Sequence, residues 1–144
     1  MATVRETSHE LGADLQAAVA RIYSRFRSER SDGELGDAAV GVLIALAKSG
    51  ALTLTELSER ARVTTGSMSQ TVNRLVAGGY VERDRDPADG RRMLIGATPA
   101  GAEIAAAARA HRRSWLDARL AELTPAERAT LAEASALIRR IADS

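Results

Sequence analysis

The chain has 144 residues, no cysteine, only four aromatic residues and almost no net charge. The absence of cysteine excludes disulfides, thiolate metal sites and a cysteine nucleophile. Because strands favour aromatic and β-branched side chains, the shortage of aromatics counts against a sheet-rich fold. Lys and Arg number 20 against 19 Asp and Glu, which leaves a net charge of +1. Composition alone therefore gives no reason to expect a polyanionic partner such as nucleic acid.

Long hydrophobic runs are also missing. No stretch approaches the ~18 to 20 consecutive apolar residues that a membrane-spanning helix needs. The opening residues, MATVRETSHE, lack the basic and apolar regions of a secretory signal. We therefore expect a cytoplasmic protein that makes no membrane contact. With 45% hydrophobic and 27% charged residues, the chain has enough apolar side chains to fold as one unit, and its abundant alanine favours helices.

Apolar residues recur at spacings of three and four in the first third of the chain, which predicts amphipathic helices. A first helix is expected over about residues 8–29, a turn over residues 31–34, and a second helix that ends near Ser49 and Gly50. Glycine in this place favours a helix end. The expected apolar faces are Leu11, Leu15, Val19, Ile22 and Phe26 in the first helix, and Val40, Leu43, Leu46 and Ala47 in the second.

A third, short helix is predicted from Thr53 to about Ala61. Thr53 and Glu56 have the spacing of a capping box, in which the threonine hydroxyl accepts from a free backbone N–H and the glutamate reaches back to the cap residue. Only about residues 62–63 separate this helix from the next one. A connection this short is typical of a helix-turn-helix.

The fourth helix is expected over residues 66–77, with Thr64 or Thr65 as its cap and Gly78-Gly79 as its end. Its apolar side is expected to be Met68, Val72, Leu75 and Val76. The helical periodicity then turns the opposite side outward, and that side consists of Thr65, Gly66, Ser69, Gln70 and Asn73.

A β-hairpin and two further helices complete the pattern. Residues 80–85 and 92–97 look like short strands, and the turn residues of 86–90 separate them. Thr98-Pro99 and Thr124-Pro125 each supply a cap and a proline at the start of a helix. The expected stripes are Ile104, Ala108, His111, Trp115 and Arg119 in the fifth helix, and Leu131, Ala134, Ile138 and Ile141 in the sixth.

The outward side of the fourth helix has two interpretations. In a helix-turn-helix it would face DNA, where the amides of Gln70 and Asn73 suit paired bonds with adenine, and the free N–H groups at the helix start favour a phosphate. Polar residues on an outer face are equally what any solvated helix shows. The hairpin does not decide the matter, because its arginines, Arg83, Arg85, Arg91 and Arg92, are balanced by four acidic residues.

An enzyme is not expected. The two histidines, His9 and His111, are far apart in sequence and form no His-x-x-x-His or Glu-x-x-His motif. Gly-rich phosphate loops and the Gly-x-Ser-x-Gly motif are missing as well. The acidic residues of the hairpin do not match the spacing of an EF-hand loop. We therefore expect no catalytic residue, no metal and no cofactor.

Residues 52–101 resemble, without gaps, the winged helix-turn-helix of the MarR family of transcriptional regulators. The matching pieces follow in order: TELSERARV, SMSQTVNRLVAGGYVER, and DPADGRR followed by a strand and TPAG. Asp89-Gly90-Arg91 fills the Asp-x-Arg motif of the family's wing, whose arginine typically enters the minor groove. The flanking helices also match the family's plan, in which the terminal helices form a dimer.

The resemblance implies a mainly α fold with a small β-hairpin wing, in which residues 1–34 and 99–144 are dimerisation helices and residues 35–98 bind DNA. In the implied function, a homodimer binds a pseudo-palindromic double-stranded DNA site as a ligand-responsive repressor. The candidate DNA-binding residues are Thr65, Ser67, Ser69, Gln70, Asn73, Arg74, Arg83, Arg91 and Arg92. Many members of the family carry an acid at the position of Asn73, and in some of them it pairs with the wing arginine. Asn73 can offer a hydrogen bond but no opposite charge, which leaves open how Arg91 is held.

The resemblance also implies a small aromatic or phenolic ligand between the dimerisation helices and the winged domain. The candidate lining residues are Tyr23, Phe26, His111 and Trp115. The alternative for His111 and Trp115, which share a helix face, is packing in the core or the dimer. The alternative for the whole protein is a helical dimeric module that binds a small molecule or a protein and does not bind DNA.

Overall fold

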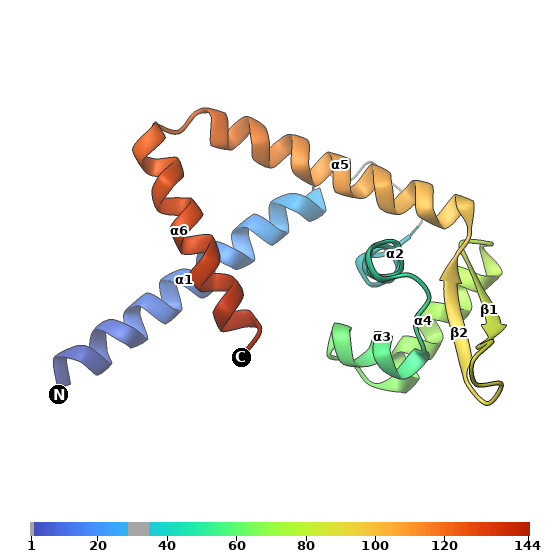
Figure 1. The fold of residues 1–144 in the computed structure, drawn as a ribbon. Helices are drawn as coiled ribbons and strands as arrows, with labels where there is room; N and C mark the ends of the chain where they lie inside the picture. Colours follow the sequence, from blue (N-terminus) through green and yellow to red (C-terminus); the bar gives the residue numbers. More distant parts are fainter. Residues whose placement is uncertain (1, 29–34) are drawn as a thin grey trace. The chain divides into compact units, whose positions relative to one another are not determined.

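The computed structural model describes residues 2–28 and 35–144, which form six helices and one two-stranded antiparallel sheet (Figure 1). The elements follow in the order α1 (Ala2–Ser28), α2 (Asp37–Ser49), α3 (Leu54–Ala61), α4 (Thr65–Ala77), β1 (Val81–Arg85), β2 (Met93–Ala97), α5 (Pro99–Ala121) and α6 (Pro125–Ala142). The chain divides into two compact units, Met1–His111 and Arg112–Ser144. This mainly helical fold with a hairpin confirms the expected fold class. The turn expected over residues 31–34 lies outside the described residues.

The hydrophobic core of the first unit lies among α2, α3, α4 and the hairpin. Leu43, Leu57, Val72 and Leu75 are its largest fully buried side chains. Val81 and Ile95 add the buried faces of the two strands, which pair in the register Val81↔Ala97 to Arg85↔Met93. Leu52 extends the sheet, because its N–H donates to the Ile95 carbonyl at 3.0 Å and its carbonyl accepts from the Ile95 N–H at 2.7 Å. The helix-turn-helix and the hairpin thus share one core.

The first two helices follow the sequence pattern with two exceptions. α1 begins at Ala2 rather than near Ser8. The sequence prediction missed this first part of the helix because the residues before Ser8 lack the apolar periodicity on which the prediction rested. α2 ends as expected at Gly50, which takes a φ of 76°. Ala47 is exposed, so its place on the apolar face was wrong, because the last turn of α2 packs on the core through Leu46.

The apolar side of α4 was predicted correctly at Met68, Val72 and Leu75 and wrongly at Val76. Val76 is 36% exposed, and Thr71 is buried in its stead. Burial of this polar side chain is tolerated because its hydroxyl donates to the Ser67 carbonyl at 3.3 Å. The face of α4 that enters the core is therefore rotated toward Thr71.

The start of α5 is joined tightly to the hairpin. The Thr98 N–H donates to the Tyr80 carbonyl at 3.0 Å, and the Thr98 hydroxyl donates to the Gly79 carbonyl at 2.6 Å. Gly101 and Ala105 are the buried residues of this helix. A Cβ atom on Gly101 would collide with the Tyr80 carbonyl oxygen. Because only glycine fits at this contact, α5 lies directly against the backbone at the start of β1.

The rest of α5 differs from the expected stripe. Ile104 and Ala108 are half-buried, whereas His111 and Arg119 are exposed, so their expected place on a buried face was wrong for the single chain. The buried face instead consists of small residues, since the close approach to β1 leaves no room for large ones. Trp115 is half-buried.

The terminal helices present apolar side chains to solvent. In α1 the exposed ones are Leu11, Val19, Ile22 and Tyr23. In α6 they are Leu131, Leu137, Ile138 and Ile141. The predicted capping box of α6 is confirmed. The Thr124 N–H donates to Glu127 Oε2 at 2.8 Å, and the Glu127 N–H donates to Thr124 Oγ1 at 3.2 Å. Both helices are thus well formed, and their apolar faces are uncovered in the single chain.

Candidate nucleic-acid interface

The turn between α3 and α4 sets the angle at which the two helices meet. Arg62 ends α3 in the left-handed region, with a φ of 54°, a conformation that costs a non-glycine residue about 1 to 2 kcal/mol. The Val63 N–H then donates to the Ser58 carbonyl at 3.1 Å, and Thr64 caps α4 by accepting from the Ser67 N–H at 3.1 Å. Of the two expected caps, Thr64 is the one used. The short helix-turn-helix connection predicted from the sequence is confirmed.

The amino-terminal half of α4 carries polar residues on its exposed side. Ser69 is half-buried, and the other polar residues of the candidate set on this helix are exposed: Thr65, Ser67, Gln70, Asn73 and Arg74. Gly66 is exposed as well, and a Cβ atom there would meet nothing within 4 Å. This half of the helix therefore offers small and amide side chains beside the free N–H groups of a helix start.

The tip of the wing is shaped by two aspartates. Asp86 Oδ1 accepts from the Ala88 N–H at 2.9 Å, and Asp89 Oδ1 accepts from the Arg91 N–H at 3.1 Å. Such side-chain bonds to the backbone two residues on are typical of tight turns. Among the described residues, nothing bonds the Arg91 guanidinium, which is exposed. The acid of the Asp-x-Arg motif thus holds the backbone of Arg91 and leaves its side chain to solvent.

Asn73 is linked to the wing through a different arginine. Arg83 Nη2, from β1, donates to Asn73 Oδ1 at 2.6 Å. This bond joins the middle of α4 to the first strand of the hairpin. It answers the question that the sequence left open, since the residue replacing the family's acid bonds Arg83 and not Arg91.

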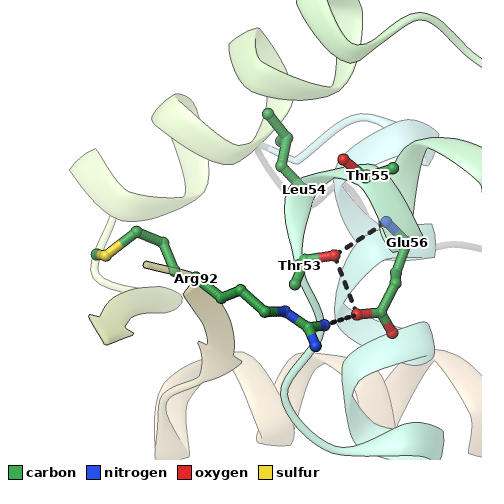
Figure 2. Close-up of a pocket in the computed structure, with 6 residues that line it drawn as sticks. Thr53, Leu54, Thr55, Glu56 and Arg92 are labelled. Atoms are coloured by element: carbon green, nitrogen blue, oxygen red, sulfur yellow. Dashed lines mark hydrogen bonds and ion pairs between the residues drawn. The ribbon is translucent and has the colours of Figure 1, made fainter. Parts of the chain in front are cut away.

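Arg92 lies in the wing loop directly before β2, and α3 holds its side chain. Arg92 Nη2 is 3.0 Å from Glu56 Oε1, and the same oxygen accepts from the Thr53 hydroxyl at 3.0 Å (Figure 2). Thr53 Oγ1 in turn accepts from the Glu56 N–H at 3.2 Å, which is the expected helix cap. The glutamate reaches back to the hydroxyl of Thr53, so its carboxylate serves both the cap and the ion pair.

The candidate residues therefore fall into three groups. The α4 residues other than half-buried Ser69 are exposed, as is the Arg91 side chain; Arg83 is bonded to Asn73, and Arg92 is bonded to Glu56. Sequence reasoning missed Glu56 as a partner of the wing, since 36 residues separate the pair and no local pattern marks it. Both arginine bonds tie the hairpin to the helix-turn-helix, one from β1 and one from the end of the wing loop, whereas the Arg91 side chain at the tip is exposed.

A cavity of about 470 Å³ lies in the first unit among α1, α2, α3 and α4. Of the four candidate ligand residues only Tyr23 lines it, and Phe26, His111 and Trp115 do not. The remaining lining residues are mostly apolar, with Asp37 and Arg60 as the charged ones. Arg60 Nη1 donates to the Ser49 hydroxyl at 2.6 Å. The cavity has the size and mixed lining of a small-molecule site.

Two further properties concern the described residues, 2–28 and 35–144. They contain no cluster of three or more histidine, aspartate or glutamate side chains that could hold a metal ion. None of their helices is long and apolar enough to cross a membrane.

Comparisons with known proteins agree with this geometry. The model of the MarR family matches residues 34–92. An HTH-type transcriptional regulator of Mycobacterium bovis is 34% identical over 138 residues, which cover 96% of each chain. Among solved structures, a MarR family protein from Bacillus stearothermophilus has a TM-score of 0.87 at 21% identity, covering 97% of this chain and 98% of that one.

A second solved structure adds a functional context. BpsR of Bordetella bronchiseptica, whose DNA binding is regulated by 6-hydroxynicotinic acid, is 26% identical with a TM-score of 0.71. The match covers 92% of this chain and 93% of that one. With a 34% identical relative along nearly its whole length and the family model on its winged helix-turn-helix, the chain belongs to the MarR family, whose members are DNA-binding transcriptional regulators and not enzymes.

Proposed function

We propose that the protein is a homodimeric repressor that binds a pseudo-palindromic double-stranded DNA site and is released from it by a small aromatic or phenolic ligand. In this proposal residues 35–98 bind DNA, and residues 1–34 and 99–144 form the dimer. The observation that carries the proposal is the exposed polar half of α4 beside a wing whose tip leaves Arg91 free.

DNA reading is divided between the helix and the wing. Each α4 enters a major groove with Gln70 and Asn73 facing base edges, and the two helices of the dimer meet successive grooves about 34 Å apart. Ser67, Ser69 and Arg74 contact bases or the backbone. Arg91 enters the flanking minor groove, where a narrow groove and its negative potential attract guanidinium groups.

The dimer explains the apolar faces of the terminal helices. Leu11 in α1 is 67% exposed and Ile141 in α6 is 62% exposed. Monomeric proteins rarely expose a continuous apolar stripe of this kind, and burial contributes about 25 cal/mol for each Å² of apolar surface removed from water. A second copy of the chain is the partner that covers both stripes at once.

The ligand occupies the cavity of about 470 Å³ that Tyr23 and Arg60 line. Arg60 has N–H groups beyond the one on Ser49, and these favour a carboxylate or phenolate oxygen, while the apolar walls favour a ring. Regulation of BpsR by 6-hydroxynicotinic acid supports this ligand class. The ligand acts by binding more tightly to a conformer in which the two reading helices have the wrong separation, which shifts the population away from DNA.

A binding assay with the DNA upstream of the protein's own coding sequence tests the proposal. We expect a discrete shifted complex with one dimer per site, protection of two half-sites about one helical turn apart, and dissociation on adding an aromatic hydroxy acid. If neither this DNA nor a random duplex library yields a specific complex, the protein is instead a helical dimer that binds a small molecule or a protein without DNA.

A further inference from the structure

Asn73 has an unusual position for a base-reading residue because its side-chain oxygen is already occupied. An asparagine free in the major groove suits adenine, since its oxygen accepts from the N6 amino group while its NH₂ group donates to N7. Here Arg83 Nη2 lies 2.6 Å from Asn73 Oδ1. The bond takes one of the two lone pairs of this oxygen and sets a positively charged guanidinium group beside the acceptor that adenine would need.

The chemistry of arginine fixes the orientation of the amide. A guanidinium group has five N–H donors and no acceptor, so the oxygen of Asn73, and not its nitrogen, must face Arg83. Asn73 Nδ2 then faces away from Arg83 with its two N–H donors, while the oxygen keeps one lone pair beside the guanidinium group. Both residues are exposed, so nothing in the described part of the chain covers the pair.

The pair presents mostly donors. Asn73 contributes its NH₂ group, Arg83 contributes the N–H groups that do not bond Asn73, and the second lone pair of Asn73 Oδ1 is the remaining acceptor. The major-groove edge of guanine has two neighbouring acceptors, O6 and N7, whereas adenine has one acceptor beside an amino donor. A pair so rich in donors therefore matches guanine better than adenine, whose amino group would lie beside the N–H groups of Arg83.

We propose that Asn73 and Arg83 act as one donor-rich unit that selects guanine over adenine at the base facing residue 73. This inference rests on the proposed DNA binding and adds to it a base preference opposite to that of asparagine alone. Arg83 is in this sense a positioning residue as well as a donor, because it decides which end of the Asn73 amide faces the base. Gln70 lies one turn earlier on the same exposed face, has no such partner among the described residues, and keeps the preference for adenine.

The experiment compares base preferences of the wild type and the Arg83→Ala variant in selections from a random duplex library. Wild type is expected to select guanine at one position of each half-site. Loss of Arg83 frees Asn73 Oδ1, so the ratio of guanine to adenine binding at that position should fall at least about fivefold, the low end of the discrimination given by one good base contact. Arg83→Lys keeps a donor for Asn73 and should retain guanine.

Arg85 supplies the matched control. It lies two residues along the same strand, carries the same charge, and bonds the Gly90 carbonyl at 3.2 Å instead of Asn73. Arg85→Ala should weaken binding to all sequences alike and leave the base preferences unchanged. In wild type, replacing the selected guanine with 7-deazaguanine, which lacks the N7 acceptor, should also lower the affinity.

The outcomes separate the inference from the proposed function. If wild type selects a site but Arg83→Ala keeps the same preference as Arg85→Ala, the donor-rich unit is wrong while DNA recognition stands. Adenine at that position in the wild-type site would overturn the inference in the same way. If wild type selects no sequence at all, the proposed function itself fails and the inference falls with it.

Discussion

The contact between α5 and the hairpin makes a sharp prediction for Gly101→Ala. In an exposed helix, alanine is favoured over glycine by about 0.8 to 1.0 kcal/mol. At Gly101 the added Cβ atom would overlap the Tyr80 carbonyl oxygen and lie 3.0 Å from Leu43 Cδ2. The carbonyl cannot easily turn aside, because it also accepts from the Thr98 N–H at 3.0 Å. Gly101→Ala should therefore lower the free energy of unfolding, whereas a glycine-to-alanine substitution in an exposed helix usually raises it.

The magnitude follows from two opposing terms. Overpacking a tight site costs about 1 to 3 kcal/mol, and a backbone obstacle places Gly101 at the upper end of that range. Subtracting the gain of about 1 kcal/mol from helix propensity leaves a loss of about 2 kcal/mol in the free energy of unfolding. For a chain of this size the Tm should fall by about 4 to 8 °C.

Gly41 in the middle of α2 serves as the control. A Cβ atom there would meet nothing within 4 Å, so Gly41→Ala should raise stability by about 0.5 to 1 kcal/mol. Both variants should be compared with wild type by thermal and urea unfolding at one fixed protein concentration, because the proposed dimer would make the Tm depend on concentration. If Gly101→Ala proves as stable as Gly41→Ala, the close contact between α5 and Tyr80 is refuted.

Three other predictions concern the wing, the cap of α3 and the dimer. Arg91→Ala should weaken specific DNA binding by about 1 to 3 kcal/mol if the exposed guanidinium enters a groove, and unchanged affinity in a titration at moderate salt would remove the wing tip from recognition. Thr53→Ala should cost about 1 kcal/mol of unfolding free energy at any salt concentration, because a helix cap is lost. Glu56→Gln keeps an acceptor and loses only the ion pair with Arg92, whose side chains are 51% (Arg92) and 39% (Glu56) exposed. The free energy of unfolding should therefore fall by less than about 1 kcal/mol, and the effect should vanish in 1 M salt. A larger loss of unfolding free energy than that of Thr53→Ala would contradict this account. Ile141→Glu should turn a dimer at micromolar concentration into a monomer in sedimentation experiments, and a variant that stays dimeric would exclude this face of α6 from the interface.

The helix ends could be predicted from the sequence because their causes are local. Thr53, Thr64 and Thr124 each accept from a backbone N–H three residues on, and Gly50 ends α2 with a positive φ. These signals need only neighbouring residues. The order of elements and the polar face of α4 followed from the same local patterns.

The side-chain pairs could not be predicted in this way. The bonds from Arg83 to Asn73 and from Arg92 to Glu56 span 10 and 36 residues, and they depend on where the hairpin lies against the helices. The exchange of Val76 for Thr71 in the core has a similar origin, since a small rotation of α4 decides between two positions at the border of its apolar face. Such choices are made by tertiary packing, which overrides residue type.

Acidic residues of the hairpin lie on a strand with one edge unpaired among the described residues. Within the described residues β1 pairs with β2 alone, so its other edge keeps backbone groups that a strand from another molecule could bond. Glu82 and Asp84 alternate with Arg83 and Arg85 along this strand, and charged side chains on an open edge discourage such pairing. In the proposed DNA complex these acidic residues would weaken the attraction of the wing for DNA, and the same charges would oppose the pairing of the open strand with a strand of another molecule.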